Sequence, residues 1–290
     1  MASTKLSTYM KLKVLISFVL LGLIIFSCKN NSSRKSNLVL SDSISKAAVL
    51  DTTTIKEGEI PIFYNMYLSV EMTSLFKSIG ATYNYKLLNS PNKVDKYIAS
   101  TEKALNLGVY AVDLCYAKYF EQFDQASRYL KNMHKLSTEM GIPDDKFYLS
   151  VKRIETNLSN KDSLVKIANE LYSTTDIYLR ENERESSAAL IIVGGWIESL
   201  YIATNLNKKQ NSDLDLINRI AEQKYSLKNL IDLIKKYPND KIAVEYLDRM
   251  TNLQNIFKTL DVNTNDMQFT NTQLQNIGKQ IADLRKAIVG

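Results

Sequence analysis

The chain has 290 residues, of which 45% are hydrophobic and 23% charged, and its net charge at neutral pH is +6. Residues 1–27 contribute three lysines and no acidic residue, so the remaining 263 residues carry a net charge of only +3. Their basic residues are interspersed with acids and form no basic stripe, which excludes a nucleic-acid partner.

Residues 1–27 have the composition of a cleaved export signal. Three lysines precede an apolar run over residues 14–26, and a small residue stands directly before Cys28. The run has 13 residues, whereas a membrane-spanning helix needs about 20. We therefore predict a signal peptide over residues 1–27, with translation starting at Met1 or at Met10.

The sequence Ile25-Phe-Ser-Cys28 resembles the lipobox of bacterial lipoproteins. In that family the cysteine thiol receives a diacylglycerol, the chain is cut before the cysteine, and fatty acids such as palmitate hold the protein on the membrane; two or more chains suffice for stable anchoring. Residues 29–35 depart from the acid-rich export signal of many surface lipoproteins of Bacteroidota. The resemblance implies a lipid anchor at Cys28 in the outer membrane, facing the periplasm, with the cell surface as the alternative.

Residues 28–59 contain the lipidated cysteine and a stretch rich in Ser, Asn, Thr and Lys, with few large apolar residues. Such a composition cannot bury enough apolar surface to order itself, so we predict a flexible tether. A flexible coil of about 30 residues has a reach on the order of 30 Å, which would hold the body of the protein clear of the lipid headgroups.

From residue 60 to residue 290 the apolar residues recur at helical spacing, and no run alternates with period two for long enough to predict a strand. Ser90-Pro91, Gly141-Ile-Pro143 and Tyr237-Pro238 mark helix boundaries. We predict an all-α domain, either a single antiparallel bundle or an array of helical hairpins. About ten helices are expected, near residues 62–79, 91–106, 108–122, 123–140, 143–158, 160–182, 184–206, 212–236, 239–260 and 270–289.

Two of these helices share the pattern Gly-x-aromatic-x-x-x-Leu-x-x-Ala at a constant offset of 86 residues. The matching pairs are Gly108/Gly194, Tyr110/Trp196, Leu114/Leu200 and Ala117/Ala203. A glycine beside a large aromatic residue lets a second helix approach closely while the ring fills the neighbouring volume. We expect both helices in the centre of the core, with Gly194 and Gly195 at a close helix crossing. A weak internal duplication and coincidence both account for the match.

Three segments resemble parts of uncharacterised helical lipoproteins of Bacteroidota: Ala81–Tyr85, Ala104–Tyr116 and Ile192–Ala203. The most distinctive piece is Gly-Gly-Trp-x-Glu-x-Leu-Tyr, which ends at Tyr201, and the resemblance extends over most of the chain from about residue 60. It implies the compartment and the all-α fold, and it brings no known activity.

Asp113 and Glu198 are acidic residues within the two apolar helices, and Glu198 is the only charged residue between Ala188 and Ala203. A buried carboxylate must be paired, hydrogen-bonded or protonated. We favour a structural role, in which each acid pairs with a buried tyrosine hydroxyl or an arginine. The alternative places both acids in one pocket that binds a cation or a glycan, or that divides acid and base roles as in glycosidases.

Four aromatic residues accompany these acids as possible ligand contacts: Tyr83, Tyr85, Tyr110 and Trp196. Tyr83 and Tyr85 belong to an early group of tyrosines, whose amphipathic rings suit interfaces and carbohydrate faces. Core packing is the competing interpretation, and it explains most aromatic residues of a helical protein.

His134 is the only histidine, which excludes a multi-histidine metal site, and its position between lysines predicts an exposed helical residue. Cys115 lies in an apolar stretch and is predicted to be a buried small hydrophobe. The sequence has no phosphate-binding loop and no zinc-protease or serine-hydrolase motif. We therefore expect no metal and no cofactor.

The last predicted helix carries an apolar seam with 3,4 spacing. Its members are Leu274, Ile277, Ile281, Leu284 and Ile288. Two heptads are too few to diagnose a coiled coil, so we favour docking of this helix onto the protein's own bundle. A helix that binds a partner protein is the alternative.

These observations favour a membrane-anchored periplasmic lipoprotein that acts as a binding or scaffolding module. The alternative is a glycan- or cation-binding protein, or a hydrolase, that uses Asp113 and Glu198. A structure that shows whether the two acids share a cavity discriminates between these functions.

Overall fold

The computed structural model describes residues 72, 75, 76, 79–145, 147–157, 161–207, 214–258 and 271–290. All of them belong to the unit Glu57–Gly290. The predicted signal peptide, the lipid site at Cys28, the tether and most of the helix predicted near residues 62–79 lie outside the described residues.

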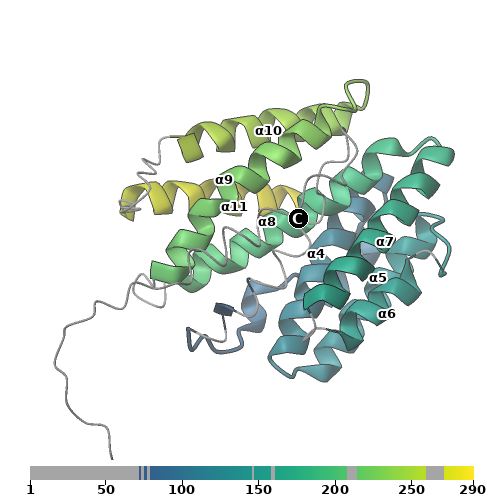
Figure 1. The fold of residues 1–290 in the computed structure, drawn as a ribbon, viewed down its shortest axis with the longest axis horizontal. Helices are drawn as coiled ribbons and strands as arrows, with labels where there is room; N and C mark the ends of the chain where they lie inside the picture. The colour runs from purple at the N-terminus through teal and green to yellow at the C-terminus, as the bar shows by residue number, and fades with distance from the viewer. Residues whose placement is uncertain are drawn as a thin grey trace, which may run out of the picture. The chain divides into compact units, whose positions relative to one another are not determined.

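The described residues form eight α-helices and two 3-10 turns and contain no strand, which confirms the all-α prediction (Figure 1). The elements are η2 (Tyr85–Leu87), η3 (Pro91–Lys96), α4 (Ser100–Tyr119), α5 (Phe123–Glu139), α6 (Tyr148–Thr156), α7 (Lys161–Glu181), α8 (Glu185–Asn207), α9 (Leu214–Ile234), α10 (Lys241–Lys258) and α11 (Asn271–Val289). Each helix from α4 to α10 contacts the next helix in the chain, as expected for a bundle or an array of helical hairpins.

The predicted boundary between helices 91–106 and 108–122 is wrong. Residues 91–96 form the 3-10 turn η3, with Ser90 accepting a hydrogen bond from the backbone of Asn92, and a single helix, α4, then runs through Gly108. The true start of α4 is marked by Glu102, whose carboxylate accepts hydrogen bonds from backbone N–H groups just before the helix at 3.0 and 3.1 Å. Gly108 lies inside α4, where it allows the close approach of α8 and does not end the helix.

Helices α4 and α8 cross with their backbones in contact, as the Gly-aromatic pattern predicts. A Cβ atom on Gly108 would lie 1.9 Å from the carbonyl oxygen of Ile191, and one on Gly194 would lie 1.9 Å from that of Leu105. Gly195 also lies at the crossing, where an added Cβ atom would be 3.4 Å from the carbonyl oxygen of Gly108. Only hydrogen fits at the first two positions, so the glycine Cα–H groups face carbonyl oxygens directly.

Helix α8 is apolar on all sides because α4, α7, α9 and α11 contact it. Among the described residues, Ser186–Leu206 is the one segment long and apolar enough to cross a membrane, and 83% of its most apolar window is buried within the protein. Burial among neighbouring helices accounts for that composition without a membrane.

The C-terminal seam docks within the protein, as the favoured interpretation expects. Ile277, Ile281, Leu284 and Ile288 are buried, and α11 contacts α4, α8 and α10. Leu274, at the start of the seam, is half-buried. A partner protein that binds α11 would therefore have to use the exposed face of the helix.

Candidate functional site

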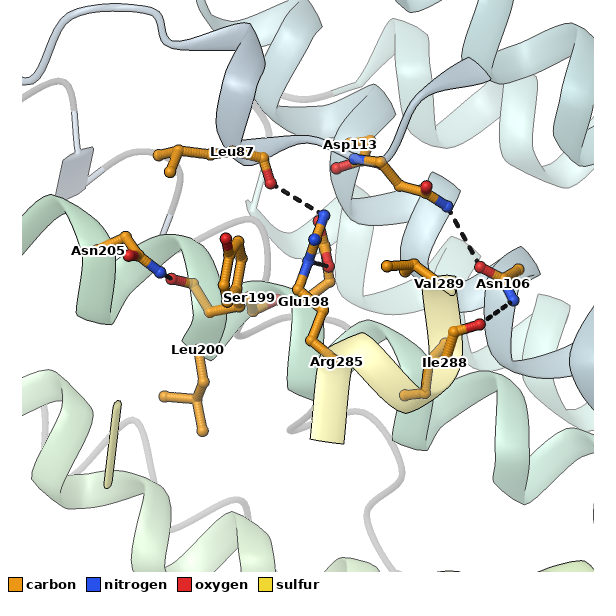
Figure 2. A network of polar contacts seen from close by, with 12 residues as sticks. Leu87, Asn106, Asp113, Glu198, Ser199, Leu200, Asn205, Arg285, Ile288 and Val289 are labelled. Carbon is orange, nitrogen blue, oxygen red and sulfur yellow. Dashed lines mark hydrogen bonds and ion pairs between the residues drawn. The ribbon is translucent and has the colours of Figure 1, made fainter. Parts of the chain in front are cut away.

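Glu198 and Arg285 form a buried ion pair between α8 and α11. Arg285 donates from Nε to Glu198 Oε2 at 2.5 Å and from Nη2 to Oε1 at 2.8 Å, so both carboxylate oxygens are occupied. The side chains are 0% and 11% exposed. Arg285 also lies 4.1 Å from the ring centroid of Tyr201 and donates to the carbonyl oxygen of Leu87 at 3.0 Å (Figure 2). This bidentate geometry, with further contacts to the guanidinium, is what a buried charge pair requires.

Asp113 joins this pair from α4 and is fully buried. Its Oδ2 accepts a hydrogen bond from the backbone N–H of Asn89 at 3.1 Å, whereas Oδ1 has no donor among the described residues. Burial and then the Glu198 carboxylate raise the pKa of Asp113 well above its ordinary value, and Arg285 only partly opposes them. The hydrogen bond from the backbone of Asn89 lowers the pKa, but less than burial and Glu198 raise it.

The two candidate acids therefore lie in one buried network. Glu198 pairs with an arginine, as the favoured structural interpretation expects, whereas Asp113 accepts from the backbone of Asn89 and makes no hydrogen bond to a tyrosine or an arginine among the described residues. Neither carboxyl group is exposed to solvent, because both side chains are fully buried. The site therefore holds two buried carboxyl groups beside one guanidinium, which binds both oxygens of Glu198.

Asp113 is one of four buried polar residues on a single face of α4. The others are Asn106, Tyr110 and Tyr116, and the spacing of 4, 3 and 3 residues keeps all four in line along the helix. They face residues 82–93, which we call the anchored segment and which contains η2 and the start of η3. Tyr116 Oη accepts from the backbone N–H of Asn84 at 3.2 Å, and Tyr110 Oη donates to the carbonyl oxygen of Ser90 at 3.0 Å.

Asn89 is the centre of the anchored segment and is buried. Its side-chain Nδ2 donates to Tyr97 Oη at 2.8 Å and to Asn106 Oδ1 at 3.2 Å. Its backbone carbonyl accepts from Tyr129 Oη of α5 at 3.0 Å, while its N–H donates to Asp113. Buried backbone outside regular helices must find partners elsewhere, and here the side chains of α4 and α5 supply them.

The end of α11 is held by the same network. Asn106 Nδ2 donates to the carbonyl oxygen of Ile288 at 2.9 Å, as Figure 2 shows. Lys93 Nζ donates to the carbonyl oxygens of Val289 at 3.0 Å and Gly290 at 2.6 Å. The last carbonyls of a helix have no partner within the helix, so α4 and the anchored segment complete the C-terminus of α11.

Tyr110 and Trp196, two of the aromatic candidates, are fully buried. Besides the bond from Tyr110 to the anchored segment, Trp196 Nε1 donates to Gln223 Oε1 of α9 at 3.3 Å. Both side chains thus have packing and hydrogen-bonding partners within the protein, and a ligand role for either stays a prediction.

Tyr83 and Tyr85 lie in different environments. The Tyr83 ring is half-buried, 5.6 Å from the ring centroid of Tyr116 and 6.2 Å from that of Phe120, and its hydroxyl is buried without a hydrogen-bond partner in the described part of the chain. Tyr85 is 65% exposed. The two tyrosines were predicted to act together, but Tyr83 packs on α4 and Tyr85 faces solvent.

His134 and Cys115 lie outside the site. The side chain of His134 is 41% exposed, in line with the prediction, and its Nε2 lies 3.0 Å from Asp144 Oδ1. Its ring packs 4.4 Å from the ring centroid of Tyr148. Cys115 is half-buried, so the prediction of full burial is wrong. Cys115 lies away from the α4 face that carries the polar residues. Its sequence neighbours Leu114 and Tyr116 are both buried.

Comparison with known proteins adds no assignment, because no protein-family model, curated protein or solved structure matches the chain. Sequence reasoning missed Arg285, Asn89 and the α4 residues Asn106 and Tyr116. Arg285 follows directly on a seam residue of α11, where an arginine normally faces solvent, so the sequence carries no signal for its burial. The in-line polar residues of α4 were the available signal, and only Tyr110 and Asp113 were recognised.

Proposed function

We propose that the chain is an outer-membrane lipoprotein, anchored through a lipidated Cys28 and facing the periplasm, whose helical unit is a binding or scaffolding module. The apolar run over residues 14–26, which ends just before the cysteine and resembles a lipobox, supports the anchor. The arrangement of the buried charges supports the role of the helical unit.

One observation supports the binding or scaffolding role of the helical unit: both acids are bound by other residues of the protein. A glycoside hydrolase needs two carboxyl groups that reach the substrate from either side of the scissile bond. Here both oxygens of Glu198 are bound by Arg285, and Asp113 binds the backbone of Asn89. Catalysis through this pair would require the surrounding structure to open.

The position of the anchored segment in the chain suits a scaffold. Residues 82–93 lie between Cys28 and α4 in the sequence, so any load transmitted along the chain from a lipid anchor to the helices crosses this segment. Side chains of α4, α5 and α11 bind it. Attachment at this point lets the helices keep their arrangement, and so present a binding surface, when a force acts on the membrane-anchored end of the chain.

Lipidation is tested by expressing wild type, Cys28→Ser and Cys115→Ser in a bacterium with an outer membrane. We expect mass spectrometry to find an acylated N-terminal peptide that begins at Cys28 in the wild type and in Cys115→Ser, both in the membrane fraction. Cys28→Ser should keep residues 1–27 uncleaved and lose the lipid. A wild-type protein that retains residues 1–27 contradicts the proposal.

The non-catalytic role is tested with Asp113→Asn, which keeps the shape and the neutral charge of a protonated Asp113. We expect any thermal shift that wild type shows with a panel of glycans and divalent cations to persist unchanged in this variant. Glycan hydrolysis by wild type, or a ligand shift that a stable Asp113→Asn protein loses, would favour the alternative in which Asp113 and Glu198 bind ligand.

A further inference from the structure

Charge balance in the core points to a proton on Asp113. Two carboxyl groups, Asp113 and Glu198, are fully buried beside one guanidinium, that of Arg285. Both oxygens of Glu198 accept from Arg285, which marks Glu198 as the ionised member. A second carboxylate would leave an uncompensated charge in the core and an unsatisfied Oδ1. A proton on Asp113 removes the uncompensated charge and makes the carboxyl group a donor as well as an acceptor.

In the part of the chain that the structure describes, Arg285 is the positive group that acts on Asp113, and the groups around them are an acid and tyrosines. Two charged groups act on Asp113: Glu198 on α8 and Arg285 on α11. Four tyrosines also lie close enough to interact with it, namely Tyr110 on α4, Tyr129 on α5, and Tyr83 and Tyr97, which precede α4 in the chain. Burial raises the pKa of each of these tyrosines above the ordinary value, so they stay neutral. Burial alone would lower the pKa of Arg285, but Glu198 raises it, and its charge is already bound by Glu198.

The same carboxyl group also touches the anchored segment, through the hydrogen bond from Asn89 N–H to Oδ2. Arg285 touches the segment at the carbonyl of Leu87. The hydrogen bond from Asn89 by itself favours the ionised form of Asp113, but burial, which raises the pKa, is the larger effect. Moving the segment would admit water to the carboxyl pair and remove that burial, so the protonation state of Asp113 and the attachment of the segment are coupled.

We propose that the proton on Asp113 is a latch: it keeps the anchored segment attached to α4 and α11, and its loss at rising pH releases the segment. This device does not depend on lipidation of Cys28, but it acts on the same segment whose attachment supports the proposed scaffold role.

The direction of the effect follows from proton linkage. When the segment is attached, the pKa of Asp113 is raised; when it is released into water, Asp113 returns to about 3.9. Between these two values the attached state holds one proton that the released state has lost. The equilibrium constant for release therefore increases about tenfold per pH unit in that window and levels off above the raised pKa.

The test is hydrogen exchange of residues 82–93 across a pH series, measured by mass spectrometry on the lipidated protein in detergent. Wild type is compared with Asp113→Asn at each pH, so the intrinsic pH dependence of exchange cancels. We expect the ratio of wild-type to variant exchange rates to increase roughly tenfold per pH unit above about pH 4. Tyr110→Phe, which deletes a non-titrating bond to the same segment, should exchange faster than wild type by the same factor at every pH. A wild-type to Asp113→Asn ratio that is constant with pH overturns the latch.

A second measurement needs no variant. Infrared spectra of the wild-type protein at neutral pH should contain the carbonyl stretch of a protonated carboxyl group, and that band should shift when aspartate is labelled with carbon-13. Absence of the band, or a band that does not shift on labelling, overturns the proposal even if Asp113→Asn fails to fold.

Discussion

At the scale of single residues, Glu198 and Arg285 depend on each other. Two charges taken out of water are tolerated when their geometry is bidentate and their other donors are satisfied. Arg285 meets both conditions, since its donors bind Glu198 and the backbone of Leu87 while its face rests on Tyr201. Removing one partner leaves the other as a buried, unpaired charge.

Glu198→Gln should lower the free energy of unfolding by about 3–5 kcal/mol, because the neutral amide leaves the Arg285 guanidinium without a counter-ion. The matched control is Glu245→Gln, which breaks the half-exposed pair with Arg249 and should cost about 1 kcal/mol or less. Denaturant unfolding at pH 7 measures both. Equal losses in the two variants would show that the Glu198 pair behaves as a surface pair.

At the scale of elements, the crossing of α4 and α8 sets the arrangement of the core. The contacts are reciprocal: Gly108 meets Ile191 and Gly194 meets Leu105, and a shift of 86 residues relates Gly108 to Gly194 and Leu105 to Ile191. The residues that match between α4 and α8 in sequence therefore also make equivalent contacts across the crossing, as in a local two-fold arrangement of the two helices. This relation is what a duplication would leave, and it is also the simplest way to pack two similar helices.

Gly194→Ala should destabilise the protein by about 3 kcal/mol or more, because the new methyl group meets backbone that cannot move without separating the helices. Gly195→Ala is the matched control. Its methyl group would be 3.4 Å from the nearest atom, so we expect a change between zero and a gain of about 1 kcal/mol from better helix propensity. Thermal unfolding separates the two, and equal effects would contradict the close crossing.

At the scale of the whole molecule, the local pattern of the sequence predicted the helices and their central pair. Apolar spacing gave the all-α class, and the Gly-aromatic pattern gave the crossing because both are properties of one or two helices. The boundary near residue 107 failed because a glycine that ends a helix and one that admits a neighbouring backbone look alike in sequence.

The anchored segment could not be predicted in the same way. Its backbone groups are satisfied by residues that are distant in sequence, such as Arg285 for Leu87 and Tyr129 for Asn89. The pairing of Glu198 with Arg285 spans 87 residues and carries no periodic signal. The sequence identified both acids as unusual, but only the fold shows that they lie together beside one arginine.

The most direct test of this account is the free energy of unfolding of wild type and Asp113→Asn as a function of pH. The folded protein raises the pKa of Asp113 above the unfolded value of about 3.9, so between these values folded Asp113 keeps a proton that the unfolded chain releases. Wild type should lose about 1.4 kcal/mol per pH unit relative to the variant as the pH rises above about 4, until the raised pKa is passed. A difference that stays constant with pH, or that favours wild type as the pH rises, would contradict it.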